Sequence, residues 1–127
     1  MLYAILCYDD EKAICAWTHE QEELAMTQLG AVEDKLRKQR RLGPVARLRP
    51  TSAARTMRKG RETRIVDGPF AETKEQLLGF FIVDCATPEE ALETARELGQ
   101  ANPTNGSYEV RPLLVFHPSG ELRGQDS

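Results

Sequence analysis

The chain has 127 residues, of which 40% are hydrophobic and 29% are charged, and its formal net charge is -3. This length suits one compact domain whose core needs no disulfide or metal, and it excludes two full domains. The cysteines at positions 7, 15 and 85 include no Cys-x-x-Cys motif, which excludes a zinc finger or a redox pair and favours a reducing, cytoplasmic compartment. No apolar run approaches the roughly 18 residues of a transmembrane helix, so no membrane span is expected.

Charge is divided unevenly along the sequence. Residues 35–64 contain twelve basic residues and one acid, Glu62, a net charge of +11, so the remaining residues sum to -14. Such a split indicates either a basic segment that neutralises acids of the same chain or a partner subunit, or a site for phosphate or nucleic acid. No Phe, Tyr or Trp lies between Trp17 and Phe70, which argues against nucleic acid held by base stacking. Paired or solvated charge is the simpler interpretation.

The first half of the chain predicts a strand, a loop and a long helix. Residues 2–8 place apolar side chains on both faces, as a central strand does, and residues 9–12 form a loop. Thr18 and Gln21 have the spacing of a capping box. The helix that they start carries an apolar stripe formed by Ala25, Leu29, Val32 and Leu36. The Gly-Pro pair at 43–44 is expected to end it, because proline cannot continue a helix.

The middle of the chain predicts short strands and a second central strand. Residues 45–49 form a short strand, and residues 54–66 form a hairpin that turns at Lys59-Gly60. Residues 77–85 are apolar on both faces, and Gly79 within them marks a bulge or a close backbone contact.

A second helix and a last strand complete the pattern. Thr87-Pro88-Glu89-Glu90 combines an N-cap threonine, a proline at the first helical position and a glutamate at the third. The buried stripe of this helix is predicted to be Ala91, Leu92, Ala95 and Leu98. Residues 107–116 alternate like a strand, in which Pro112 indicates an edge or a strand end. Residues 117–127 form a polar C-terminal tail.

The order of these elements predicts the fold. Each helix lies between strands and can bury only one stripe, which favours an antiparallel sheet with both helices on one face. This is an α+β, ferredoxin-like arrangement with an inserted hairpin, in a single domain of residues 1–116. Because the central strands are apolar on both faces, the other face needs a cover, and a second copy of the sheet is the simplest one. The sequence therefore predicts a homodimer.

A longer pattern begins at Asp67. The run Asp-Gly-Pro-Phe-Ala-Glu-Thr-Lys-Glu at 67–75 leads into Gly-Phe-Phe at 79–81. It resembles the motif of the DGPF subfamily of YCII-related proteins, and further agreement comes from Tyr8-Asp-Asp-Glu11 and from the segment 106–112. The resemblance covers about residues 1–115. It implies a dimeric α+β barrel and, for this branch, a regulatory association with extracytoplasmic-function sigma factors.

Some YCII-related proteins are similar to small enzymes in which a His-Asp pair is the proposed proton-transfer site. This sequence departs from that pattern, because its long helix contains no histidine beyond the capping segment. Only His19 and His117 are available. His19 at the first helical position is expected to be a neutral surface residue, since the helix dipole disfavours a positive charge there. His117 lies in the tail.

The candidate site is built around Asp67. This side chain either locks the Asp-Gly-Pro turn by accepting backbone N–H bonds or faces a cleft as a general base. Arg111 either pairs with an acid on the same sheet face, such as Asp84, or points into the cavity, where its planar fork suits a carboxylate or phosphate. Asp67 is the candidate catalytic residue. The predicted ligand-binding residues are Asp9, Asp67, Glu72, Thr73, Lys74 and Arg111.

The sequence contains no metal-ligand spacing such as His-x-x-x-His and no Gly-rich phosphate loop, so no metal and no cofactor are expected. Two functions remain open. The first is a homodimer that binds a small polar or anionic ligand and has an acid/base enzymatic role. The second is a non-catalytic regulatory or protein-binding module that acts with an extracytoplasmic-function sigma factor.

Overall fold

The structure is a computed structural model, and it describes residues 1–118, 120, 122 and 123. Its elements are β1 (Leu2–Asp9), α1 (Glu11–Cys15), α2 (His19–Lys38), β2 (Leu42–Arg47), the 3-10 turn η1 (Thr51–Ala53), β3 (Arg55–Arg58), β4 (Arg64–Asp67), β5 (Gln76–Asp84), α3 (Pro88–Gln100) and β6 (Ser107–Pro112). Of the polar tail predicted at 117–127, residues 119, 121 and 124–127 lie outside the described residues.

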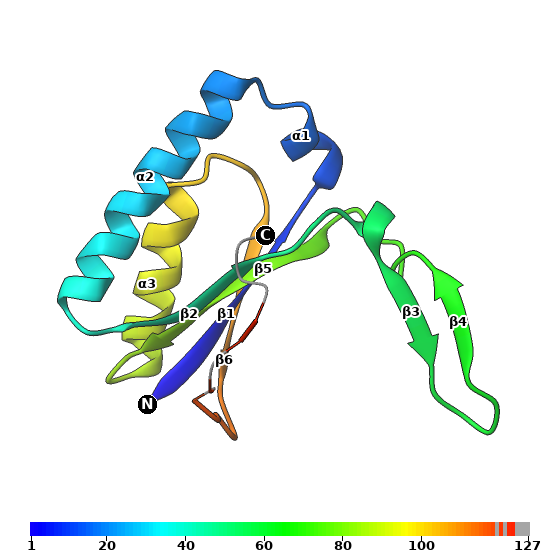
Figure 1. Ribbon diagram of the computed structural model, residues 1–127. Coiled ribbons are helices and arrows are strands. Elements are labelled where there is room, and N and C mark those ends of the chain that lie inside the picture. The colour runs from blue at the N-terminus through cyan, green and yellow to red at the C-terminus, as the bar shows by residue number, and fades with distance from the viewer. Residues whose placement is uncertain (119, 121, 124–127) are drawn as a thin grey trace.

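Four strands form one antiparallel sheet in the order β2-β5-β1-β6, and α2 and α3 lie side by side on one of its faces (Figure 1). This α+β order is compatible with the ferredoxin-like arrangement predicted from the sequence. The sheet of one protomer has two edges, β2 and β6, and does not close into a barrel. Within the described residues, no helix is long and apolar enough to cross a membrane.

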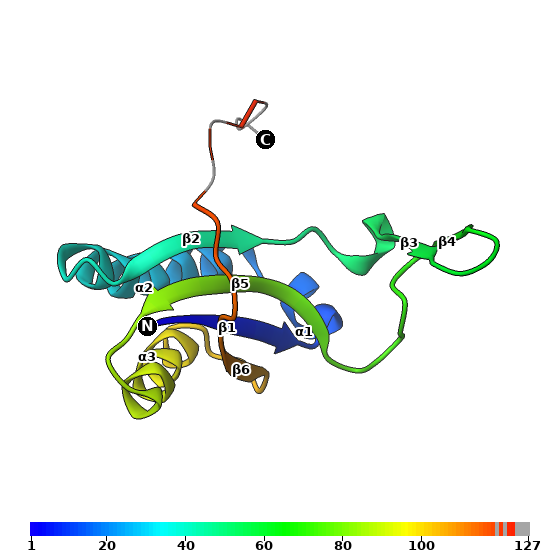
Figure 2. The same ribbon diagram turned by 90° about the horizontal axis from the view of Figure 1, so that it is seen from below.

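The predicted hairpin is confirmed and stands apart from the sheet. Strands β3 and β4 pair with each other as a separate two-stranded sheet. We call residues 55–67 the arm, because Figures 1 and 2 show them projecting beyond the end of the main sheet.

The core lies between the sheet and the helices. Strands β1 and β5 present Tyr3, Ile5, Phe81 and Val83 to this layer, and the helices contribute Leu36, Ala91, Ala95 and Leu98. Both helix starts follow the sequence. Thr18 Oγ1 accepts a hydrogen bond from the Gln21 N–H at 3.1 Å, and the Gln21 side chain accepts one from the Thr18 N–H at 2.9 Å. Thr87 Oγ1 caps α3 by accepting from the Glu90 N–H at 3.1 Å.

The predicted end of the long helix is wrong. Helix α2 stops at Lys38, where Arg40 adopts a left-handed backbone (φ 59°) and the Arg41 N–H bonds back to the Leu36 carbonyl at 2.9 Å. The Gly-Pro pair at 43–44 lies inside β2, with an irregular register between Leu42 and Val45. Proline is tolerated there because β2 is an edge strand, where a missing N–H can face solvent.

Three further predictions need correction. Residues 9–12 are not only a loop, because Asp10 Oδ1 caps the short helix α1 by accepting from the Lys12 N–H at 3.0 Å. Leu92 is 60% exposed, and Thr94 takes its place on the buried side of α3. The last strand ends at Pro112 rather than at residue 116.

Part of the basic segment is neutralised within the chain, in line with the simpler interpretation of its charge. Five of the twelve basic residues have a carboxylate within ion-pair distance, namely Lys35, Arg37, Arg41, Arg47 and Arg55. The partner of Lys35 is Glu97 of α3 at 3.1 Å, and that of Arg41 is Glu90 at 3.2 Å. These pairs join α2 and the start of β2 to α3.

The close contact predicted at Gly79 is present, since a Cβ there would lie 2.5 Å from the Ala46 carbonyl oxygen of β2. We therefore expect Gly79→Ala to lower the free energy of unfolding by about 1–3 kcal/mol, because the strands must move apart. Gly30→Ala on α2 is the control, because its Cβ would meet nothing within 4 Å, and it should stabilise the helix by about 0.5–1 kcal/mol. Urea titration measures both variants, and equal effects would contradict this account.

Candidate functional site

The covered side of the sheet contains a cavity of about 260 Å³. Strands β1, β2, β5 and β6 form its floor, and α1, α2 and the segment around Trp17 form its walls. Most of the lining side chains are apolar, among them Ile14, Trp17, Ala25, Leu29 and Phe81. The volume lies just below the usual range for ligand pockets, which suits a small molecule.

Short helix α1 closes one end of the cavity. Its residues Ile14 and Cys15 line the cavity, and so do Leu48 and Pro50 beside η1. The Glu11 carboxylate ties the two segments together, because it accepts hydrogen bonds from the Thr51 N–H at 2.7 Å and from the Thr51 hydroxyl. The wall is therefore held by charge-assisted hydrogen bonds, which are stronger than neutral ones.

Two neighbouring side chains at the floor are polar but uncharged. Cys7 of β1 and Tyr108 of β6 are register partners, and both line the cavity. Burial raises the pKa of the Cys7 thiol to about 12, and burial likewise raises the pKa of the Tyr108 hydroxyl to about 12. The Cys7 thiol donates to the Ile5 carbonyl oxygen at 3.8 Å, and Asn102 is another lining residue. At neutral pH the floor thus offers a thiol, a phenol and an amide, and no thiolate nucleophile.

Asp9 at the end of β1 is the one predicted site residue that lines this cavity. It is 5% exposed, and both carboxylate oxygens are used, Oδ1 by the Asp10 N–H at 2.8 Å and Oδ2 by the Thr104 hydroxyl. Gly106 packs against it, since a Cβ there would lie 2.6 Å from Asp9 Oδ2. Asp9 therefore anchors the loop before β6 through hydrogen bonds to both of its carboxylate oxygens.

Asp67 lies in the arm and not in a cleft. Its side chain is 90% exposed, and Oδ1 faces Arg55 Nε across the hairpin at 3.4 Å. The turn is held instead by Gly68, which has a φ of 97° and donates its N–H to the Ala54 carbonyl at 2.8 Å. A left-handed φ of this kind favours glycine. The expected backbone bonds to the Asp67 carboxylate are absent from the described residues.

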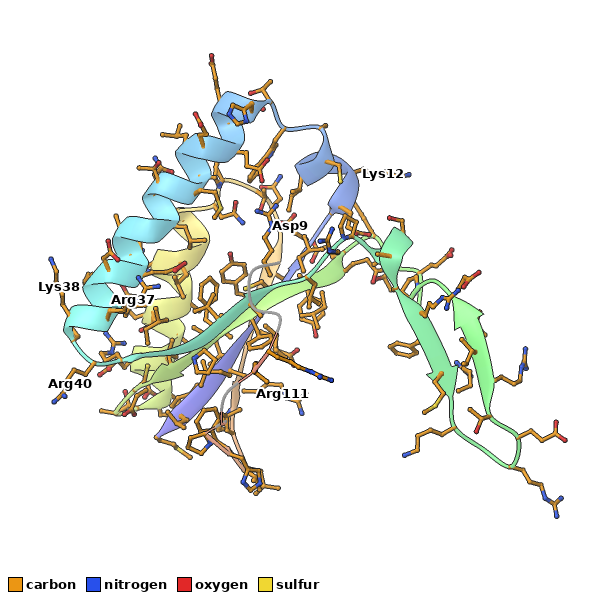
Figure 3. All side chains as sticks on the ribbon, in the orientation of Figure 1. Asp9, Lys12, Arg37, Lys38, Arg40 and Arg111 are labelled. Carbon is orange, nitrogen blue, oxygen red and sulfur yellow. The ribbon has the colours of Figure 1, made fainter. Side chains whose placement is uncertain are left out.

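The other predicted residues also lie away from the cavity. Glu72, Thr73 and Lys74 are exposed in the segment between the arm and β5, where the Thr73 hydroxyl bonds to the Glu75 carbonyl. Arg111 is exposed on the sheet face that the helices leave open, opposite Ala4 in register. Figure 3 shows Asp9 beside α1 and Arg111 on the other side of the sheet. One protomer therefore does not bring Asp9, Asp67 and Arg111 together.

Arg111 does not form the ion pair with Asp84 that was considered as its structural role. Asp84 Oδ1 instead faces the amino group of Met1 at 2.9 Å. His19 is exposed at the start of α2 and lies 3.2 Å from Glu23, one helical turn further on. Both observations leave these residues at the surface and outside the cavity.

Sequence reasoning missed the cavity residues Cys7, Trp17, Asn102 and Tyr108. Alternation alone assigns Cys7 and Tyr108 to the faces of their strands, but a cavity depends on how far α2 and α1 stand from the sheet, which no local pattern encodes. The capping sequence Asp10-Glu11 was the available signal for α1. Among the described residues, no group of three or more His, Cys, Asp or Glu side chains could hold a metal ion.

Comparison with known proteins assigns the family. The model of the YCII-related domain matches residues 1–117. The chain belongs to the YCII-related family. A protein of Rhizobium meliloti (strain 1021) that is described as uncharacterized is 58% identical over 123 residues, which cover 96% of this chain and 98% of that protein. This YCII-related protein and its relative thus align over most of their lengths, and the relative's name assigns no activity.

The raised pKa of Cys7 makes a direct prediction. At pH 8 a pKa of about 12 leaves only about one Cys7 in ten thousand as thiolate, so iodoacetamide should alkylate exposed Cys15 while Cys7 stays unmodified. Peptide mass spectrometry after a timed reaction measures each site. All three cysteines should react at similar rates in denaturant, and equal rates for Cys7 and Cys15 in the native protein would contradict the site described here.

Proposed function

We propose that this YCII-related protein binds a small, mostly apolar molecule carrying one hydroxyl or carbonyl group. The observation that carries this proposal is the cavity of about 260 Å³, which is lined by apolar side chains and has the uncharged groups of Cys7, Asn102 and Tyr108 at its floor. Apolar walls supply affinity by excluding water, and a few polar groups fix the orientation of the ligand.

The cavity favours this chemistry over the small anionic ligand expected from the sequence. The nearest basic side chain among the lining residues is Arg47, which already faces Glu22 at 3.3 Å. Three carboxylates, those of Asp9, Glu11 and Glu33, also line the cavity. An anion would therefore lose its water without gaining a free cation, which makes its burial unfavourable.

Trp17, the single tryptophan, lines the cavity and reports binding by its fluorescence. We expect 4-methylphenol to change this fluorescence in a saturable way, with a Kd of about 0.1–1 mM for so small a molecule. Ala25→Phe should abolish the change, because Ala25 is 5% exposed and its ring would fill the cavity. Leu24→Phe, at an exposed position of the same helix, should leave it intact.

Tyr108→Phe provides a test that does not depend on filling the cavity. It should weaken binding of 4-methylphenol severalfold, because it removes a hydrogen-bonding hydroxyl, and should leave binding of toluene unchanged. Circular dichroism checks that each variant is folded. A wild-type protein whose Trp17 fluorescence responds to neither compound would overturn the proposal.

We further propose that the protein is a homodimer whose sheets pack face to face into a dimeric α+β barrel. The face opposite the helices presents Leu2, Leu6, Tyr8 and Phe80, all half-buried, around the buried Ala4 and Ile82. No helix of the described chain covers this face (Figure 1), and the segment that follows β6 runs across it (Figure 2). A sheet that is apolar on both faces is stable in water when both are covered.

Leu6→Lys tests this interface. It places an ammonium group at the centre of the open face and should convert dimer to monomer at micromolar concentration, because an unpaired charge cannot be buried cheaply. Leu24→Lys on the outer surface of α2 is the matched control and should remain dimeric. Size-exclusion chromatography with light scattering gives the masses, and a dimeric Leu6→Lys protein would refute the face-to-face arrangement.

A catalytic role for Asp67 depends on this assembly. Within one protomer Arg55 is its only ion-pair partner among the described residues, whereas in a dimer the arm and the open face that carries Arg111 border the same junction. A polar ligand site at this junction would be formed by Asp67, Glu72, Thr73, Lys74 and Arg111. Asp9 would not belong to it, because Asp9 lines the cavity. Asp67→Asn should then leave binding of 4-methylphenol unchanged, since the two sites are separate.

The run from Asp67 to Glu75 supports placing the chain in the DGPF subfamily, and it raises a second candidate function. The projecting arm favours a non-catalytic module that binds a protein such as an extracytoplasmic-function sigma factor in the cytoplasm. Co-purification of a sigma factor that is lost when the arm is altered would favour this module. Ligand binding at Trp17 without any such complex would favour the small-molecule function.

A further inference from the structure

We propose that the arm grips a second copy of this chain, so that the partner lies in the angle between the arm and the open face of the sheet. This inference rests on the homodimer proposed above and adds a second contact to it. The partner is thus held by two surfaces, one on the sheet and one on the arm.

The arm lacks a core of its own. Met57 and Ile65 are register partners on one face of the hairpin, and they are 57% and 71% exposed. Phe70, just beyond the arm, is 78% exposed. A two-stranded ribbon is marginally stable in water unless another surface packs against it, so these side chains require a partner.

The direction of the arm also favours a second copy as its partner. In Figure 1 it leaves the end of the sheet near β2 and β5 and turns to the side opposite α2 and α3. Figure 2 shows that it stays beside the end of the sheet instead of folding back over the helices. A copy seated on the open face therefore has the arm at its flank. By two-fold symmetry the partner's arm makes the same contact in return.

The charge of the arm is opposite in sign to that of the rest of the chain. The arm contains Arg55, Arg58, Lys59, Arg61 and Arg64 against Glu62 and Asp67, a net charge of +3, so the rest of the chain carries -6. Arg58 and Arg64 are register partners, and like charges directly opposite each other are unfavourable unless an acid lies near. The acidic body of a second copy supplies such acids. A nucleic acid would also suit the arginines, but it would leave Met57 and Ile65 uncovered.

The test compares dimer dissociation constants by sedimentation equilibrium. Ile65→Lys should raise the Kd for dimer dissociation at least tenfold, because it places a charge in the proposed apolar contact between the arm and the partner. Ile65 is exposed in one protomer, so this replacement does not disturb the core. Leu92→Lys is the matched control, since Leu92 is 60% exposed on the helix layer, and its Kd should equal that of the wild type. A wild-type Kd for Ile65→Lys, in a protein that Leu6→Lys turns into a monomer, would overturn the arm contact and leave the homodimer standing.

Cross-linking gives an independent readout. A mixture of ¹⁴N- and ¹⁵N-labelled protein, treated with a zero-length amine-to-carboxylate reagent, should yield peptides that join Lys59 of one isotope to an acid of the other. The inference would be refuted if every cross-linked Lys59 peptide joined residues of the same isotope in a sample that is dimeric by sedimentation. A monomeric wild-type protein would refute the homodimer and the arm contact together.

Discussion

The structure depends on one constraint, which is that two helices cover only one face of a four-stranded sheet. Strands β1 and β5 carry apolar side chains on both faces, and α2 and α3 bury those that include Tyr3, Ile5, Phe81 and Val83. The covered face holds the core and the cavity. The open face holds a second apolar surface, with Arg111 on the edge strand β6. The proposed ligand site and the proposed dimer contact each follow from one of these two faces.

On the covered face, two buried side chains at the floor of the cavity stay uncharged. The thiol of Cys7 and the phenol of Tyr108 stay protonated, because removing them from water raises both pKa values to about 12. The buried carboxylate of Asp9 accepts hydrogen bonds from the Asp10 N–H and from the Thr104 hydroxyl of the loop before β6. Such a floor offers a ligand neutral hydrogen bonds. These uncharged groups are the basis of the binding function that we propose.

The sequence predicted those helices and strands whose position depends on neighbouring residues alone. The capping residues Thr18, Gln21 and Thr87 place both long helices at their observed starts, and alternation identifies β1 and β5. The Gly-Pro pair at 43–44 was misleading, because its effect depends on β2 being an edge strand, which is a property of the assembled sheet. Helix α1 has too few residues to show a helical period.

The candidate site was harder to predict because it depends on distances between elements. Asp9 does line the cavity, but Asp67 and Arg111 are separated by the projection of the arm and by the alternation of β6. The run that starts at Asp67 carries the family resemblance, yet within one chain its role is to hold the turn that ends the arm. The proposed homodimer would bring a second surface to these side chains.

The central claim is that one chain leaves its sheet half covered and a second copy completes it. Sedimentation equilibrium of the unmodified protein over a wide range of micromolar concentrations tests this most directly. The account predicts a mass of twice the 14.3 kDa of one chain, with dissociation only on dilution. A mass of 14.3 kDa at every concentration would contradict it.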